Sequence, residues 1–105
     1  MYIVTKKQVR PNQTVDFFNI SSPLISLEAK EYLRNTYKLT GKLVFVTIEV
    51  SEDDLVQTAT MMWESKDVYD AFMADPIIGA QIRDISDEYR IANGITTELV
   101  STEEI

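Results

Sequence analysis

Two neighbouring strand patterns in the middle of the chain constrain the fold most. Leu43–Val50 alternates apolar and β-branched residues, and Leu55–Glu64 follows it with Val, Thr, Met and Trp, which are typical of strands. The charged segment Ser51–Asp54 between them is typical of a hairpin loop. We therefore expect an antiparallel β-hairpin, and the rest of the chain must pack around it.

A strand and a helix precede the hairpin. Tyr2–Arg10 contains several β-branched residues and ends at Pro11, which predicts a strand. Ser22 is typical of a helix N-cap and Pro23 of the first helical position after it. Apolar residues then recur at helical spacing. We expect this helix to end near Tyr37.

Further helices and one strand follow the hairpin. Ser65 is placed as an N-cap, and Asp75–Pro76 breaks that helix and caps the next one. The next helix carries an apolar stripe with 4-3-4-3 spacing, made of Ile78, Ile82, Ile85, Tyr89 and Ala92. Asn93–Gly94 supplies a left-handed C-cap. Ile95–Ser101 then predicts the last strand, and the tail Thr102–Ile105 is expected to fray.

The predicted order is strand, helix, strand, strand, helix, strand. With right-handed crossovers this order gives a four-stranded antiparallel sheet with both helices on one face, the ferredoxin-like α+β arrangement. The chain has 105 residues and shows no linker or repeat, so residues 1–105 are expected to form a single domain.

The second face of this sheet predicts a partner. Leu43 and Phe45 oppose a row of valines, and Met61 and Met62 point to opposite faces. Because a solvated face normally reads polar, we expect a second copy to cover it, in a homodimer. The predicted dimer face consists of Leu43, Phe45, Thr47 and Met62. The alternative is that a few apolar side chains lie singly on the surface.

The chain contains no His and no Cys. Catalytic triads with a histidine base, thiolate nucleophiles and Cys- or His-ligated metals are therefore excluded. The three glycines are widely separated and form no phosphate-cradling loop. We expect no catalytic residue, no metal site and no cofactor. Without cysteine, a reducing compartment such as the cytoplasm fits.

Charge is unevenly distributed along the chain. The net charge is −7, with +4 in residues 1–48 and −11 in residues 49–105. An acidic chain is repelled by phosphate backbones, which disfavours nucleic-acid binding. The longest uncharged apolar run, Leu43–Val46, is too short to span a membrane. Asp84, Asp87, Glu88, Arg83 and Arg90 are expected on a solvated helix face.

The segment Trp63–Pro76 resembles the dimeric α+β barrel superfamily, in particular its antibiotic-biosynthesis-monooxygenase-like members. It has a Trp at the end of the third strand, a Ser-capped helix with an aromatic residue near its end, and an Asp-Pro break. The resemblance implies a dimer whose two sheets face each other, and an apolar cleft between sheet and helices. The candidate cleft lining consists of Trp63, Tyr69, Phe72 and Tyr89. Plain core packing is the alternative.

Two departures from the superfamily bear on function. Its haem-degrading members carry a His on the helix after the Trp, where this chain reads Ala71–Met73, and an Asn on the first strand, where it reads Thr5–Lys7. Haem ligation of that kind is therefore excluded, whereas cofactor-free oxygenases remain compatible.

Three functional hypotheses follow. The first is a non-enzymatic homodimeric binding or structural module, with a small apolar molecule as a possible ligand. The second is a cofactor-free monooxygenase-like enzyme acting on a small aromatic or quinol-like compound beside Trp63. The third is an accessory subunit whose acidic surface docks on a basic protein partner.

Overall fold

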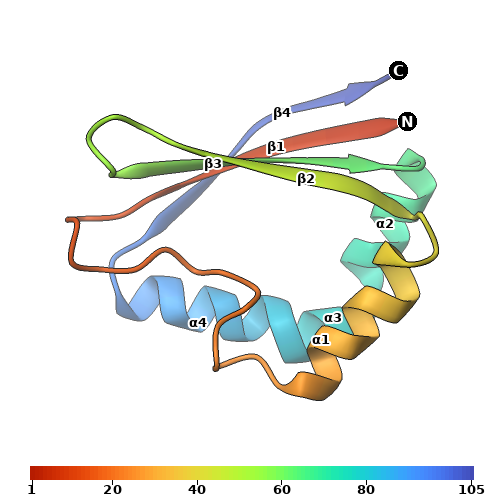
Figure 1. The fold of residues 1–105 in the computed structure, drawn as a ribbon, viewed down its shortest axis with the longest axis horizontal. Coiled ribbons are helices and arrows are strands. Elements are labelled where there is room, and N and C mark those ends of the chain that lie inside the picture. The colour runs from red at the N-terminus through yellow and green to blue at the C-terminus, as the bar shows by residue number, and fades with distance from the viewer.

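Four antiparallel strands form one sheet, and every helix lies on the same side of it (Figure 1). The computed structural model describes all 105 residues. The strands are β1 (Tyr2–Val9), β2 (Leu43–Val50), β3 (Val56–Trp63) and β4 (Thr96–Glu104), in the spatial order β2-β3-β1-β4. This order confirms the predicted ferredoxin-like α+β fold.

The first helix begins later than predicted. It comprises α1 (Leu27–Leu33) and continues as the π-helical segment η1 (Arg34–Lys38). Ser26 caps it, because its Oγ accepts a hydrogen bond from Ala29 N at 3.1 Å. The predicted cap, Ser22, instead accepts from Leu24 N at 3.2 Å inside a preceding turn.

The second helical region confirms the predicted caps. Ser65 Oγ accepts from Val68 N at 3.2 Å at the start of α2 (Lys66–Ala74). Asp75 then caps α3 (Pro76–Ile78), with Oδ1 accepting from Ile77 N at 2.9 Å. The chain continues as the π-helical η2 (Gly79–Arg83) and α4 (Asp84–Ala92), and Gly94 turns it back at φ 69°.

The core lies between the sheet and the helices, in two clusters. The larger cluster contains Tyr2, Val4, Leu33, Tyr37, Leu43, Trp63 and Ile78. The smaller one contains Phe18, Ile25 and Ala29, with Tyr89 packed against it. Most of this apolar packing lies where α1, α2 and α3 contact the start of β1, the start of β2 and the end of β3. The rest of the inner face of the sheet lies outside the main core.

A β-bulge corrects the predicted dimer face. The pairing of β2 with β3 shifts between Leu43 and Phe45, so that Leu43 pairs with Trp63 and Phe45 with Met62. Leu43 is therefore on the inner face and buried, whereas Phe45 and Met62 lie on the outer face, as does Thr47 through its pairing with Thr60. A strict alternation from Leu43 could not anticipate the extra residue.

The predicted fraying of the C-terminus is wrong. Glu104 pairs with Tyr2 and Thr102 with Val4, so β4 runs almost to the end of the chain. Ile105 N also donates to Met1 O at 2.9 Å, and the two termini lie together at one end of the sheet (Figure 1). Backbone pairing does not depend on the polarity of the side chains, so the polar composition of Thr102–Glu104 did not reveal that β4 continues through these residues.

Candidate functional site

The inner face of β1 changes from apolar to polar along its length. Tyr2 and Val4 are buried in the main core. Lys6 and Gln8 occupy the next two inward positions and are only partly buried. These two polar residues therefore lie on the face of the sheet that α4 covers, and Gln8 contacts Arg90 of that helix.

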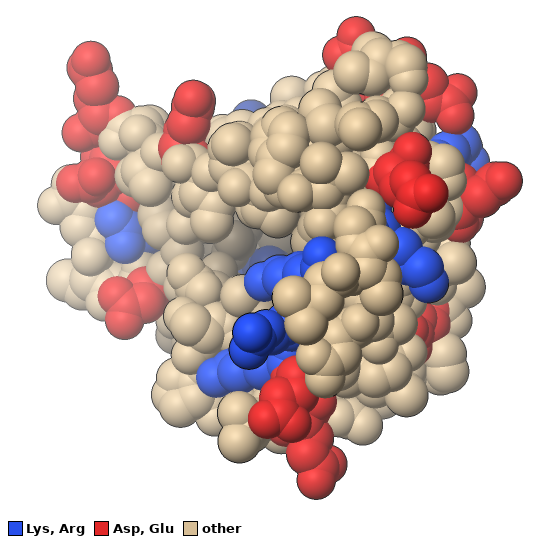
Figure 2. All heavy atoms as spheres, turned by 45° about the vertical axis from the view of Figure 1, so that its right-hand side comes forward, with Lys and Arg blue, Asp and Glu red and all other residues tan.

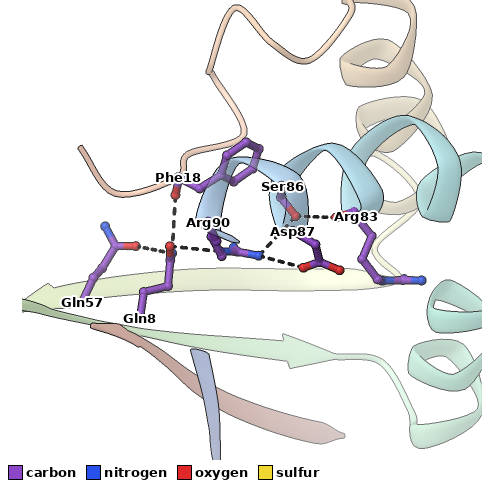
Figure 3. Close-up of polar contacts among 7 residues, drawn as sticks. All are labelled: Gln8, Phe18, Gln57, Arg83, Ser86, Asp87 and Arg90. Atoms are coloured by element: carbon purple, nitrogen blue, oxygen red, sulfur yellow. Dashed lines mark hydrogen bonds and ion pairs between the residues drawn. The ribbon is translucent and has the colours of Figure 1, made fainter. Parts of the chain in front are cut away.

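A chain of hydrogen bonds joins this part of the sheet to α4 (Figure 3). Arg90 Nε donates to Gln8 Oε1 at 3.1 Å, and Gln8 Nε2 donates to Gln57 Oε1 at 3.1 Å. Gln8 Nε2 also lies 3.5 Å from Phe18 O. The network holds the guanidinium group of Arg90 in a fixed position above β1 and β3.

The helix itself completes the network. Arg90 Nη1 donates to Ser86 Oγ at 3.2 Å and lies 3.5 Å from Asp87 Oδ1. Ser86 is buried, and its hydroxyl donates to Arg83 O at 2.8 Å. The Arg90 side chain is 21% exposed and that of Asp87 is 56% exposed. The cation is therefore largely buried between α4 and the sheet, whereas its acidic neighbour is open to solvent.

Arg83 reaches the same region from η2. Its Nη1 donates to Met73 O at 3.0 Å, and its guanidinium carbon lies 5.9 Å from the centre of the Phe72 ring. In Figure 3 the Arg83 side chain extends along the sheet, away from Arg90. The Arg83 side chain therefore contacts the C-terminal end of α2 rather than Arg90.

Positive charge is concentrated in this interlayer site, which we define as Lys6, Gln8, Gln57, Arg83, Ser86, Asp87 and Arg90. Burial, followed by the charges of Arg83 and Arg90, holds the pKa of Lys6 below its ordinary 10.5, and Asp87 opposes this only in part. Burial likewise lowers the pKa of Arg90. Lys6 forms none of the ion pairs of the protein. The interlayer site thus contains three cations and one carboxylate, and that carboxylate pairs with Arg90.

Apolar side chains flank the interlayer site on the same face of the sheet. Ile48 and Leu99 share the row of Lys6, through the pairings of Ile48 with Ala59, Ala59 with Lys6, and Lys6 with Leu99. Ile48 is 52% exposed and Leu99 is 56% exposed. Apolar surface is therefore available beside the cations on both edges of the inner face.

The predicted cleft lining does not form one site. Trp63 is fully buried, and the rings of Phe72 and Tyr69 lie 4.6 and 5.6 Å from its own. These three rings pack on each other as core. Tyr89 lies in the second cluster, 5.9 Å from the Phe18 ring, with its hydroxyl donating to Asp16 O at 2.7 Å.

A tyrosine pair on one carboxylate was missed by the sequence reading. The hydroxyls of Tyr32 and Tyr37 both donate to Asp75 Oδ2 at 2.6 Å. The other oxygen of Asp75 caps α3. This arrangement ties α1 and η1 to the helical break, and the large sequence separation left no local pattern to predict it.

The structure also corrects the predicted solvated helix face. Arg83 and Arg90 point between the layers, whereas Asp84, Asp87 and Glu88 remain exposed. A signal was present in the alternation of β1, which puts Lys6 and Gln8 on the face of Tyr2 and Val4. No three Asp or Glu side chains are arranged to hold a metal ion. None of the helices has the length and apolar character needed to cross a membrane.

Comparisons with known proteins find similar structures but no similar sequence. No protein-family model and no curated protein matches the sequence. A "putative antibiotic biosynthesis monooxygenase" from Deinococcus radiodurans matches with a TM-score of 0.56 and 13% identity, over 100% of this chain and 92% of that one. A second antibiotic biosynthesis monooxygenase matches with a TM-score of 0.51 and 13% identity, over 96% and 97%. The fold is thus that of the antibiotic-biosynthesis-monooxygenase-like, ferredoxin-like proteins, which confirms at the level of fold the resemblance carried by Trp63–Pro76.

Proposed function

We propose that this protein is a homodimeric module that binds a small organic anion between its sheet and α4. The observation that carries the proposal is that the partly buried Lys6 feels the charges of both Arg83 and Arg90, while the one opposing carboxylate, Asp87, pairs with Arg90 at 3.5 Å. Partly buried cations without counter-charges are costly to maintain, and an anion bound among them offsets that cost. The guanidinium of Arg90 is already oriented by Gln8 and Ser86.

The flanking surface defines the rest of the ligand. Ile48 and Leu99 present exposed apolar side chains in the row of Lys6. A ligand with one charged group and an apolar or aromatic body would satisfy both the cations and these side chains. The expected class is an aromatic or aliphatic carboxylate, or a phenolate, rather than the purely apolar molecule expected from the sequence.

The dimer half of the proposal rests on the outer face of the sheet. The pairings place Ile3, Met62 and Phe45 in one apolar row across three strands, and Phe45 is 44% exposed. All helices lie on the opposite face, so no part of the chain covers this row. A second copy packed face to face, related by a two-fold axis, would bury the row against itself.

Matched ligands test the binding proposal. Isothermal titration with benzoate is expected to show saturable binding, and the neutral isostere benzamide is expected to show none. Arg83→Gln and Arg90→Gln should each weaken benzoate binding about tenfold or more, since each removes a charge-assisted hydrogen bond. Lys66→Gln, on the exposed face of α2, is the control. Equal binding of benzamide and benzoate, or equal loss in the control, would refute the proposal.

The dimer is tested separately by sedimentation equilibrium. The protein is expected to be dimeric at micromolar concentration. Phe45→Asp is expected to yield monomers, because each protomer would bury one negative charge in the apolar interface. Val50→Asp changes an exposed residue on the inner face of the same strand and should leave the dimer intact. A monomeric parent protein would overturn this half of the proposal.

A cofactor-free monooxygenase is the second candidate function, and one observation favours it. The pKa of Lys6 is lowered by burial and then by Arg83 and Arg90, so a larger fraction of its amine is neutral and able to accept a proton than in an ordinary lysine at the same pH. Such a base would take the hydroxyl proton of a quinol, and molecular oxygen would then oxidise the quinolate to a hydroxyquinone, with one oxygen atom entering the ring and the other leaving as water. Oxygen uptake with a dihydroxynaphthalene tests it. Uptake equal to that of Lys6→Met would exclude the enzyme.

A further inference from the structure

A second concentration of positive charge lies on the outside of the helical layer. A pocket of about 520 Å³ opens between the first helix and the loop that precedes it. Three of its lining residues are the cations Lys30, Arg34 and Lys38. Figure 2, which brings the α1 side of the molecule forward, shows Lys and Arg side chains gathered beside a hollow. We call this the basic pocket.

The cations of the basic pocket have no ion-pair partners. Its three cations follow one another at intervals of four residues, so they share one side of α1 and η1. None of them takes part in an ion pair, and no carboxylate lines the pocket. Like charges at this spacing repel each other. The chain as a whole has a net charge of −7, so this cluster is a local exception. A bound anion would relieve the repulsion among its cations.

The backbone around the basic pocket is shaped by specific contacts. Leu39 N donates to Arg34 O at 2.8 Å, which closes the wide π-helical turn of η1. Turns of this kind occur frequently at functional sites. On the opposite wall, Asn19 Oδ1 accepts from both the backbone N and the Oγ of Ser21 at 2.9 Å. Lys30 Nζ donates to Ser21 O at 3.2 Å and so links the two walls.

Apolar residues complete the lining. Ile20, Leu33 and Leu39 line the pocket beside the cations, and Leu39 is 66% exposed. The volume lies in the range of about 300–1,000 Å³ that small-molecule sites occupy. The pocket therefore offers charge and apolar surface together, as a ligand with an anionic head and an apolar body requires.

We propose that the basic pocket binds a small organic phosphate, with the phosphate held by Arg34, Lys30 and Lys38 and the apolar body resting on Leu39. A guanidinium fork matches the geometry of phosphate oxygens, and the two ammonium groups add point charges. A phosphate carries nearly two negative charges at neutral pH, so it balances this set of cations better than one carboxylate does. The proposal is independent of the interlayer site, because the two sites share no residue.

An amide NMR titration tests the proposal with three probes. Phenyl phosphate is expected to produce saturable shifts at residues 19–22 and 30–39, and these shifts are expected to persist in Arg90→Gln, which weakens binding at the interlayer site. Inorganic phosphate is expected to shift the same amides with an affinity several-fold weaker, because it lacks the apolar body. Phenol, which lacks the phosphate, is expected to shift none of them. Phenol shifting the same amides as phenyl phosphate, or phenyl phosphate giving no saturable shift there, would overturn the proposal.

Variants separate a specific site from general charge attraction. Arg34→Gln and Lys38→Gln change exposed side chains and are expected to weaken phenyl phosphate binding about tenfold or more each. Lys66→Gln removes one positive charge on α2 and should leave the affinity unchanged. Arg90→Gln should also leave it unchanged, although the same variant is expected to weaken benzoate binding at the interlayer site. Equal weakening by Lys66→Gln and Arg34→Gln would show unspecific attraction and refute the site.

Discussion

Arg90 and Gln8 join the two layers of the protein, because Arg90 Nε donates to Gln8 Oε1 across 3.1 Å. One residue lies on α4 and the other on β1, separated by 82 positions in the chain. Gln8 passes the contact on to Gln57 of β3. A single side chain from the last helix is thereby fixed to the two central strands.

The first prediction concerns this contact. Arg90→Lys keeps the charge but loses the planar fork, so it leaves Gln8 Oε1 and Ser86 Oγ without their donor. The free energy of unfolding in urea is expected to fall by about 1–3 kcal/mol. Lys66→Gln, which breaks an exposed pair, should cost less than about 0.5 kcal/mol. Equal losses in the two variants would show that Arg90 contributes nothing structural.

The second prediction concerns the pH dependence of stability at Asp75. Burial alone raises the pKa of this carboxyl, but hydrogen bonds from Tyr32, Tyr37 and the α3 backbone outweigh it and hold the pKa below its ordinary 3.8. A lowered pKa in the folded state contributes stability that is present above 3.8 and is lost as pH falls through the folded value.

We therefore expect Asp75→Asn to be less stable than the parent at neutral pH and to lose less stability on acidification. Urea unfolding between about pH 7 and pH 2 measures both effects. Glu64→Gln, at an exposed position without side-chain hydrogen bonds in the structure, provides the matched control. An acid limb unchanged from that of the parent would contradict the lowered pKa of Asp75.

The third prediction concerns Trp63, the single tryptophan of the chain. Its side chain is fully buried, and its Nε1 has no hydrogen-bond partner. We expect blue-shifted emission that acrylamide quenches weakly, with a red shift and strong quenching only on unfolding. Strong quenching of the folded protein would mean that an open cleft exists beside Trp63, as the family resemblance first implied.

The fourth prediction concerns the end of β4. Deleting Thr102–Ile105 removes the strand pairing with Tyr2 and Val4, so the free energy of unfolding is expected to fall by about 2–4 kcal/mol. Glu103→Gln changes an exposed side chain without touching the backbone and should cost less than about 0.5 kcal/mol. A deletion as mild as this substitution would restore the prediction of a frayed tail.

Local sequence signals predicted most of the fold. Ser65, Asp75 and Gly94 each act through their own turn, so their caps could be predicted from a few neighbouring residues. The alternation over Leu43–Val50 gave the bounds of β2 correctly. It failed at Leu43, because a bulge is set by the register of the partner strand rather than by β2 itself.

The candidate site was less accessible from the sequence. Arg83 and Arg90 read as a solvated helix face, because the pattern cannot show that the sheet opposite α4 becomes polar at Lys6 and Gln8. The aromatic residues of Trp63–Pro76 lie together, but as packed core, and Tyr89 packs against Phe18 instead. Both outcomes depend on long-range packing, which no local window contains.

The titration of Lys6, followed through its side-chain carbon signals by NMR, tests the central claim most directly. A partly buried amine that feels the charges of Arg83 and Arg90, opposed only in part by Asp87, is predicted to titrate below 10.5 in the free protein. Saturating benzoate is predicted to raise that pKa, because the bound anion stabilises the charged amine, and Arg83→Gln is predicted to raise it without ligand. A Lys6 that titrates at or above 10.5 and does not respond to benzoate would contradict the anion site between the sheet and α4.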